Sequence, residues 1–334
     1  MQKGKKMSTV TTTTLSAEMK TFYDMRLIDE ASPMLVHEQF GQKRPIPQGG
    51  GKTVNFRRFS PLAKATTALT EGVTPSGSSL SVSNISAIVA QYGDYVVQSD
   101  VLELTAVDNT ILETTKLLGR QAGLTMDTIV RNALLLGTNK SYAPKYVADT
   151  NGNLVETEVT KTADLDTSAK LTVDVVQRVV AKLRAQNAPT IGGDYVCIIH
   201  PYVAYDLMRD PEWIDAHKYA TPENLYTGEI GKMAGVRFVQ STEAKIDKGG
   251  SDNPSGLAVF HCLFIGDGAY GVTEVTGGGL QTIVKQKGSS GTADPLDQRS
   301  SVGWKGLKAA KILVDNYLVD LMCCSKFSAT ATAN

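Results

Sequence analysis

The sequence predicts an α+β protein built around one long helix, and three observations support this class. Residues 108–137 carry the longest helical pattern of the chain. Alternating, strand-like runs precede and follow it, at 52–59, 80–97 and 280–287. Between residues 166 and 279, helical and strand patterns alternate, which is typical of a mixed domain. We therefore expect a long helix with strands attached to it and a separate mixed domain.

The ends of the long helix have recognisable signals. Thr110 followed by Glu113 matches a capping box, and Gly137 is expected to end the helix in the left-handed conformation. Gly119 and Gly123 are unusual inside a helix, since glycine costs about 1 kcal/mol relative to alanine there, and they suggest bending or close approach of another segment.

The long helix is expected to be amphipathic. One face gathers the apolar residues Ile111, Leu118, Ala122, Ile129, Ala133 and Leu136. The opposite face gathers the charged residues Glu113, Lys116, Arg120, Asp127 and Arg131. We expect the first face to be buried and the second to lie in solvent or against a neighbouring subunit.

Composition excludes several classes of protein. The chain has 334 residues, 42% of them apolar, and its 34 basic residues balance 34 acidic ones. A net charge of zero argues against nucleic-acid binding as the main activity. No apolar run approaches the roughly 20 residues of a membrane span, so we expect a cytosolic, non-secreted protein without a membrane segment. Its four cysteines lie in apolar runs, where we expect reduced thiols.

Two segments before the long helix are expected to need a surface outside themselves. Residues 15–31 form an amphipathic helix up to the break at Pro33. The runs at 52–59 and 80–97 form a two-stranded hairpin with a small, polar tip. An isolated hairpin is marginally stable in water, so it must lie on the chain's own domain or on another copy.

After the long helix, residues 138–170 are polar and rich in turns, with a hairpin signal at Asn151-Gly152. Thr172 is expected to cap a helix, and a second helix should begin at Pro201. Strands are expected at 195–200, 236–241, 258–266, 271–275, 280–287 and 311–325. In the last of these, we expect one face to pack on the long helix, namely Leu313, Tyr317, Val319, Leu321 and Cys323.

Two glycine motifs resemble nucleotide-binding loops. GGGKT at 49–53 lacks the first glycine of a phosphate loop, since position 46 is Ile46, and a strand follows it instead of a helix. GDGAYG at 266–271 fits the dinucleotide pattern after an apolar strand, but no helix follows and Asp267 would repel phosphate. We expect a flexible hairpin entry and a tight turn between strands, so no cofactor is predicted.

The histidines and cysteines do not predict a catalytic or metal site. Cys197 with His200, and His261 with Cys262, have spacings that suggest a metal, but in a strand both pairs point to opposite faces. Core packing is therefore favoured. The basic residues Arg57, Arg58 and Lys64 suggest either nucleic-acid contact or, preferably, a solvated or salt-bridging face between subunits.

The chain resembles the major capsid proteins of tailed bacteriophages, which share the Hong-Kong-97-type fold, and more narrowly the family of the phage N-four coat protein. The resemblance covers about residues 22–327 and is carried by GGGKTVNFRRFSPL (49–62), TALTEGVTPSGSSLSVSNISAIVAQYGDYVVQSD (67–100) and the helix end RNALLLGTN (131–139). It implies an N-terminal arm (1–40), an extended hairpin loop (41–98), a peripheral domain with the spine helix (99–165 and 280–334) and an axial domain (166–279).

The resemblance implies a structural protein, not an enzyme, that forms hexamers and pentamers of an icosahedral head around double-stranded DNA. It implies localisation in the virion after assembly in the cytoplasm of a bacterial host, with the portal protein and scaffolding or decoration proteins as further partners. Candidate inter-subunit contacts are Phe22, Tyr23, Val54, Phe56, Arg57, Arg58, Glu71, Val82 and Tyr92. The alternatives are an encapsulin-like nanocompartment shell and, more remotely, a nucleotide-dependent enzyme that uses GDGAYG.

Overall fold

The long helix expected from the sequence is present as α3 (Thr110–Leu134) in the computed structural model. The structure describes residues 25, 27–31, 34–46, 51–59, 62–74, 77–105, 110–217, 230–249, 253, 256–275, 280–289 and 294–334. The chain forms two units: 1–36 with 90–129 and 274–308, and 37–89 with 130–273 and 309–334. The boundary between them falls within α3.

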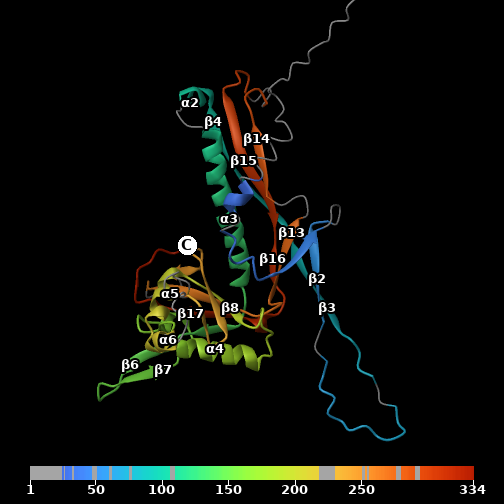
Figure 1. The fold of residues 1–334 in the computed structure, drawn as a ribbon, viewed down its shortest axis with the longest axis vertical. Helices are drawn as coiled ribbons and strands as arrows, with labels where there is room; N and C mark the ends of the chain where they lie inside the picture. Colours follow the sequence, from blue (N-terminus) through green and yellow to red (C-terminus); the bar gives the residue numbers. More distant parts are fainter. Residues whose placement is uncertain are drawn as a thin grey trace, which may run out of the picture. The chain divides into compact units, whose positions relative to one another are not determined.

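In the first unit an antiparallel sheet lies against α3 (Figure 1). Strand β15 (Arg299–Lys308) is central, between β14 (Gln281–Lys285) and β4 (Ala90–Ser99), and the short helix α2 (Asp100–Thr105) follows β4. The sequence predicted β14 but not its longer partner β15. The core between helix and sheet consists of Leu27, Leu118, Ala122, Met126, Val302 and Trp304.

The predicted roles of the helix ends need correction. Thr110 is the first residue of α3 and so does not hold the N-cap position of a capping box; its hydroxyl donates to Gln98 Oε1 at 3.2 Å, and Glu113 pairs with Lys116. Gly137 does not have the positive φ that was expected. A Cβ at this position would lie 3.1 Å from Asp315 Oδ1, so close approach of the Asp315 side chain accounts for the glycine.

The predicted faces of α3 are right near its start and wrong near its end. Leu118 and Ala122 are buried, but Leu136 lies beyond the helix and is 78% exposed. On the face that was expected to be polar and accessible, Asp127 and Arg131 are buried. The buried stripe instead continues through Met126, Val130 and Leu134. Ile129 is partly buried against the core of the first unit, so of the predicted apolar face Leu136 is the residue that is clearly exposed.

Close approach explains both glycines inside α3. Residues 27–31 are helical and cross α3 so closely that a Cβ on Gly123 would lie 2.6 Å from the Ala31 carbonyl oxygen. The corresponding distance from Gly119 to the Leu27 carbonyl oxygen is 3.0 Å. The glycines therefore let two backbones pack directly against each other.

We expect Gly123→Ala to destabilise the protein by about 1–2 kcal/mol, although alanine favours a helix by about 1 kcal/mol. The reason is that the Ala31 carbonyl is backbone and cannot move without shifting its helix. Gly119→Ala is the matched control and should be close to neutral, since its contact is looser. Urea unfolding measures both, and equal effects at the two positions would contradict this explanation.

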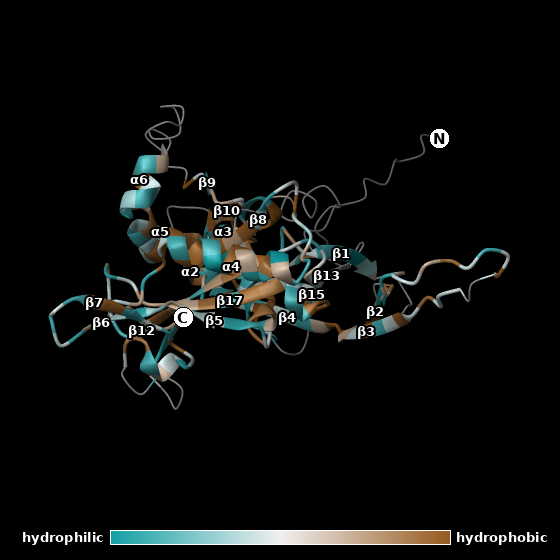
Figure 2. Ribbon diagram, turned by 90° about the horizontal axis from the view of Figure 1, so that it is seen from below, coloured by the Kyte–Doolittle hydropathy of each residue, from teal (hydrophilic) through white to brown (hydrophobic). Residues whose placement is uncertain are grey.

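The second unit is built on a seven-stranded sheet in the order β5-β17-β12-β8-β10-β9, with β11 also paired to β12. The strands are β5 (Lys140–Tyr142), β17 (Leu318–Cys323), β12 (Ala258–Ile265), β8 (Tyr195–Ile199), β10 (Val236–Gln240), β9 (Lys232–Met233) and β11 (Ile246–Lys248). The central strands β8, β12 and β17 are buried throughout, and β8 and β17 are coloured as hydrophobic in Figure 2.

Helices α4 (Val173–Ala185), α5 (Pro201–Met208) and α6 (Pro211–His217) belong to the same unit. As predicted, Thr172 caps α4 by accepting from Val175 N, and α5 begins at Pro201. The buried side of α4 packs in one core with β8, β12 and β17. The prediction that one face of the 311–325 segment packs on the long helix is therefore wrong, because β17 is a central strand of this sheet.

Smaller elements complete the second unit. One three-stranded sheet has the order β1-β13-β16, from β1 (Gln42–Ile46), β13 (Tyr270–Val275) and β16 (Ala310–Ile312). A hairpin of β6 (Lys145–Ala148) and β7 (Leu154–Thr157) surrounds the predicted Asn151-Gly152 turn. Short 3-10 helices occur at η2 (Thr162–Asp164) and η4 (Asp315–Tyr317).

Candidate assembly surface

The predicted hairpin exists, but its second strand is shorter than expected. Strand β2 (Thr53–Phe59) pairs antiparallel with β3 (Val82–Ile88), from Thr53 opposite Ile88 to Phe59 opposite Val82. The run expected at 80–97 is divided at Val89, whose N–H donates to Lys52 O at 2.9 Å. Its second half is β4, which pairs with β15 in the first unit. Alternation alone does not show where a strand changes partner.

The base of the hairpin is part of the chain's own core. Val54 and Phe56 point to one face, as predicted, and are buried together with Ala87. The Phe56 ring lies so close to Gly271 of β13 that a Cβ there would be 2.4 Å from the ring. Both side chains are therefore covered by their own chain, and their contact with a neighbouring subunit stays a prediction.

The loop beyond the paired strands has no cover from its own chain. Every described residue from 62 to 74 and from 77 to 84 is exposed. The loop extends well past the strand ends (Figure 1), and its colouring in Figure 2 is hydrophilic to neutral with hydrophobic positions among them. Large apolar side chains are exposed on the loop and its flanking strand residues: Phe59, Leu62, Leu69, Val73, Leu80 and Val82.

The hairpin is basic. Between residues 52 and 88 the sequence contains Lys52, Arg57, Arg58 and Lys64 but only one acidic residue, Glu71. The structure leaves Arg57, Arg58 and Glu71 exposed, and Val82 is also accessible. These four predicted contact residues are thus on the surface of the hairpin. Because opposite charges attract, this basic hairpin should bind best to an acidic surface.

The remaining predicted contact residues do not belong to the hairpin. Tyr92 is on β4, is half-buried and packs against the core of the first unit. Phe22 and Tyr23 lie outside the described residues, as does the predicted helix before Met25.

The tight turn expected at GDGAYG is present, and the described part of GGGKT, residues 51–53, leads into a strand as expected. GDGAYG joins β12 to β13 through a tight turn in which Gly268 has φ +68°, and no helix follows it. The end of GGGKT leads directly into strand β2. Neither segment offers a helix N-terminus to a phosphate group.

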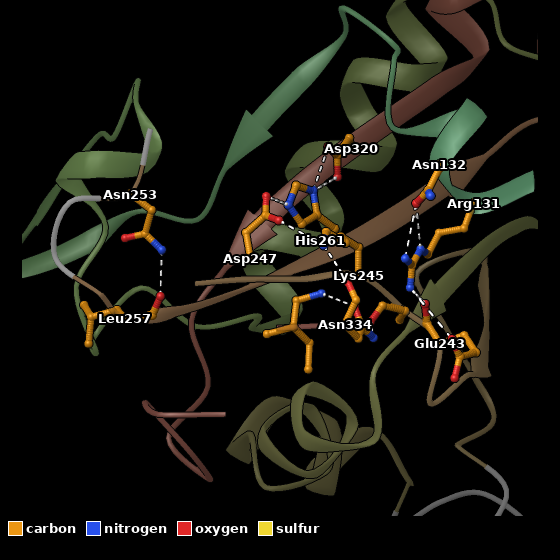
Figure 3. A network of polar contacts seen from close by, with 12 residues as sticks. Arg131, Asn132, Glu243, Lys245, Asp247, Asn253, Leu257, His261, Asp320 and Asn334 are labelled. Atoms are coloured by element: carbon orange, nitrogen blue, oxygen red, sulfur yellow. Dashed lines mark hydrogen bonds and ion pairs between the residues drawn. The ribbon is translucent and has the colours of Figure 1, made fainter. Parts of the chain in front are cut away.

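A buried charge cluster in the second unit was not predicted (Figure 3). His261 Nδ1 lies 2.9 Å from Asp320 Oδ2, and His261 Nε2 lies 2.9 Å from Asp247 Oδ2. The three residues come from the adjacent strands β12, β17 and β11. Asp320 and the His261 ring are almost fully buried, whereas Asp247 is half-exposed and also pairs with Lys245. Only the unknown strand pairing brings these distant residues together, so the sequence carried no signal for the cluster.

The charges in this cluster depend on each other. Burial lowers the pKa of His261, but the hydrogen bonds and charges of Asp247 and Asp320 outweigh it and raise that pKa to about 9. The hydrogen bond from His261 in turn lowers the pKa of Asp247 to about 2. At neutral pH His261 is therefore a buried cation between two carboxylates. The cluster thereby links the three neighbouring strands β11, β12 and β17 through charged hydrogen bonds.

We expect the free energy of unfolding to fall as the pH rises above neutrality towards about 9. His261 holds its proton more tightly in the folded protein, because its pKa there is about 9 instead of 6.5. Its contribution to the free energy of unfolding is therefore complete below pH 6.5 and is lost as the pH rises through about 9. Asp247 has the opposite dependence: its contribution to the free energy of unfolding is complete above pH 3.8 and is lost as the pH falls through about 2. Urea unfolding of wild type and His261→Gln across this range measures the difference, and parallel profiles would contradict it.

The four cysteines are free and buried, as expected of small apolar side chains. Cys262 Sγ and Cys323 Sγ lie 3.7 Å apart on neighbouring strands.

Within the described residues no group of three or more His, Cys, Asp or Glu side chains is arranged to hold a metal ion. None of the helices in the described part of the chain is long and apolar enough to cross a membrane.

Comparison with known proteins identifies the family. The model of the phage capsid protein family matches residues 84–318, which is most of the chain. This protein belongs to the phage capsid protein family. No curated protein matches the sequence. The matched region includes α3 and six of the seven strands of the large sheet and ends at the first residue of β17, so the family assignment covers parts of both units.

Solved capsid structures share the fold of this capsid protein. The capsid of Ralstonia phage GP4 matches with a TM-score of 0.63 at 17% identity, over 86% of this chain and 87% of that chain. The head structure of Helicobacter pylori bacteriophage KHP40 matches with a TM-score of 0.64 at 11% identity, over 86% and 89%. The Cyanophage Pam1 capsid matches with a TM-score of 0.63 at 14% identity, over 89% and 92%. The predicted Hong-Kong-97-type fold is thereby confirmed, and the protein is a major capsid protein of a phage head shell.

Proposed function

We propose that copies of this capsid protein assemble into hexamers and pentamers that close an icosahedral shell around double-stranded DNA. In each contact, the loop between β2 and β3 lies on a neighbouring copy. The observation that supports this contact most directly is the exposure of the whole loop together with its apolar side chains. Exposed apolar groups of this number are typical of an interaction site.

The two parts of the hairpin have different roles in this proposal. Val54 and Phe56 fix the base of the hairpin to β13, so the loop is held on a rigid support. Leu62, Leu69 and Val73 of the loop then supply apolar contact area to the neighbour. The predicted domain ranges (arm 1–40, extended loop 41–98, peripheral 99–165 and 280–334, axial 166–279) describe the proposed positions within the shell.

The role in this proposal is structural, without catalysis or a cofactor. Assembly takes place in the cytoplasm of a bacterial host, and the finished protein resides in the virion. Further partners are the portal protein, scaffolding or decoration proteins, and the packaged DNA, which the shell contacts without sequence preference.

Negative-stain microscopy and light scattering of the purified protein test the proposal. We expect closed particles, formed with a co-expressed scaffolding protein where the protein needs one. Only monomers under all these conditions would overturn it. The nucleic acid content of particles from infected cells separates a DNA-filled head from an encapsulin-like compartment, which would contain a protein cargo instead.

A further inference from the structure

A cavity of about 450 Å³ lies beside helix α4, bordered by that helix, by strand β5 and by residues 158–160 after β7. Its size is in the range of small-ligand sites. About half of its lining residues are apolar, namely Tyr142, Pro144, Val159, Val175, Val179 and Leu321. Nothing in the assembly proposal uses this cavity.

One cation in the cavity lacks a counter-charge. Lys182 Nζ donates to Lys140 O at 3.1 Å and to Ser141 Oγ at 2.9 Å, and both acceptors are neutral. An ammonium group has three donors and loses hydration when apolar side chains surround it. In agreement, burial lowers the pKa of Lys182. The site therefore has a half-buried positive charge that a bound anion would compensate.

The other charged residues of the cavity do not supply that anion. Arg178 also faces the cavity, but it is paired with Glu156 and with Asp174, the latter at 2.7 Å. Glu158 lines the cavity, is exposed, and forms no ion pair with Lys182 in the described structure. Lys182 and Lys140 are thus the cavity-lining cations in the described structure without a paired carboxylate, and of the two only Lys182 is half-buried, since Lys140 is exposed.

We propose that this cavity binds a carboxylate on a short aliphatic body. The carboxylate accepts from Lys182 Nζ and from the Ser141 hydroxyl, and the aliphatic part lies on Val175 and Val179 of α4. The half-buried ammonium group of Lys182 beside the apolar side chains of α4 suits an anionic head on an aliphatic body. The carboxylate belongs either to a free small acid or to an acidic side chain of a neighbouring copy.

Titration of the monomeric protein with hexanoate at pH 7, followed by NMR of valine and leucine methyl groups, tests the site. We expect saturable shifts at Val159, Val175, Val179 and Leu321. Hexylamine should not produce them, and hexanol should bind at least tenfold more weakly. Equal binding of hexanoate and hexanol, or no shift at these methyl groups, would overturn the proposal.

Two charge variants on one helix make the test specific. Lys182→Met should weaken hexanoate binding at least tenfold, and Arg184→Gln, which removes a charge from α4 outside the cavity, should leave it unchanged. Glu158→Gln should strengthen binding, because it removes a like charge near the carboxylate. Unchanged binding in Lys182→Met, or lost binding in Glu158→Gln, would contradict the assigned roles. Circular dichroism shows whether each variant is folded.

The source of the carboxylate is identified with assembled particles. Protection of Lys182 from acetylation in particles, relative to the monomer, would support an acidic side chain of a neighbouring copy as the ligand. Equal acetylation in both states, with hexanoate still protecting Lys182 in particles, would support a free small acid. Acetylation that hexanoate slows in neither state would overturn the site. The titration with hexanoate uses the monomer and does not depend on assembly. A failure of the carboxylate site is therefore distinguishable from a failure of the assembly proposal.

Discussion

Replacing residues 60–81 with a two-residue Asn-Gly turn should abolish particle formation and leave a folded, soluble monomer. Phe59 and Val82 are directly paired, so a two-residue hairpin turn joins the two strand ends without changing their register. The buried base, with Val54, Phe56 and Ala87, remains complete. We expect the melting temperature to change by only a few degrees and light scattering to show only monomers.

The physical reason is the apolar area that the loop presents. Burial of a side chain such as Leu62, Leu69, Val73 or Leu80 contributes about 1.5–3 kcal/mol before the costs of ordering and association. Four of them on each loop amount to a large part of a stable contact between subunits. Removal of the loop takes this contact away from every subunit at once.

Two variants with a loop of unchanged length separate the effect of its apolar side chains on particle formation from the effect of its length. Substitution of Leu62, Leu69, Val73 and Leu80 by serine should strongly reduce the yield of particles. Substitution of Thr66, Thr67, Thr70 and Thr74 by serine changes as many positions and should have little effect. If the shortened hairpin still forms particles, the proposed contact is wrong. If it becomes insoluble, the loop belongs to the chain's own core.

Local patterns predicted those parts of the fold that depend on local chemistry. The long helix, the Thr172 cap, the turn at GDGAYG and the hairpin at Asn151-Gly152 follow from residues that are close in the sequence. The loop of the proposed assembly surface was predicted in the same way. The sequence between the two strands has no regular alternation of apolar and polar residues, which indicated a loop without a core of its own.

Features that depend on distant pairing were missed or assigned wrongly. The burial of Val54 and Phe56 in their own chain was missed, because nothing in the sequence shows that Gly271 of β13, more than 200 residues later, lies against the Phe56 ring. The break at Val89 lies in a run of four consecutive apolar residues, 87–90, and such a run does not by itself show that a strand changes partner. Strand β17 was predicted to pack on the long helix, because an apolar run does not reveal which other element covers it.

Removal of the buried histidine should destabilise the second unit more than any other single change in its polar cluster. We expect His261→Leu to cost about 3–5 kcal/mol at pH 7, because Asp320 would lose its charged hydrogen-bond partner while still buried in the sheet. Asp320→Leu should cost less, since His261 can lose its proton and keep a hydrogen bond with Asp247. Asp247→Asn should cost about 1 kcal/mol or less, because that side chain is half-exposed and screened by water.

A double variant distinguishes a charge pair from simple packing. His261→Leu with Asp320→Leu replaces both charges by apolar groups, so it should be less destabilised than the sum of the two single variants by 1 kcal/mol or more. Urea unfolding of the four proteins at pH 7 gives this coupling. Additive effects, or an Asp247→Asn variant as unstable as His261→Leu, would contradict the pairing. Because β12 and β17 are neighbours at the centre of the sheet, a weakened pair should also lower the temperature at which assembled particles lose their shells.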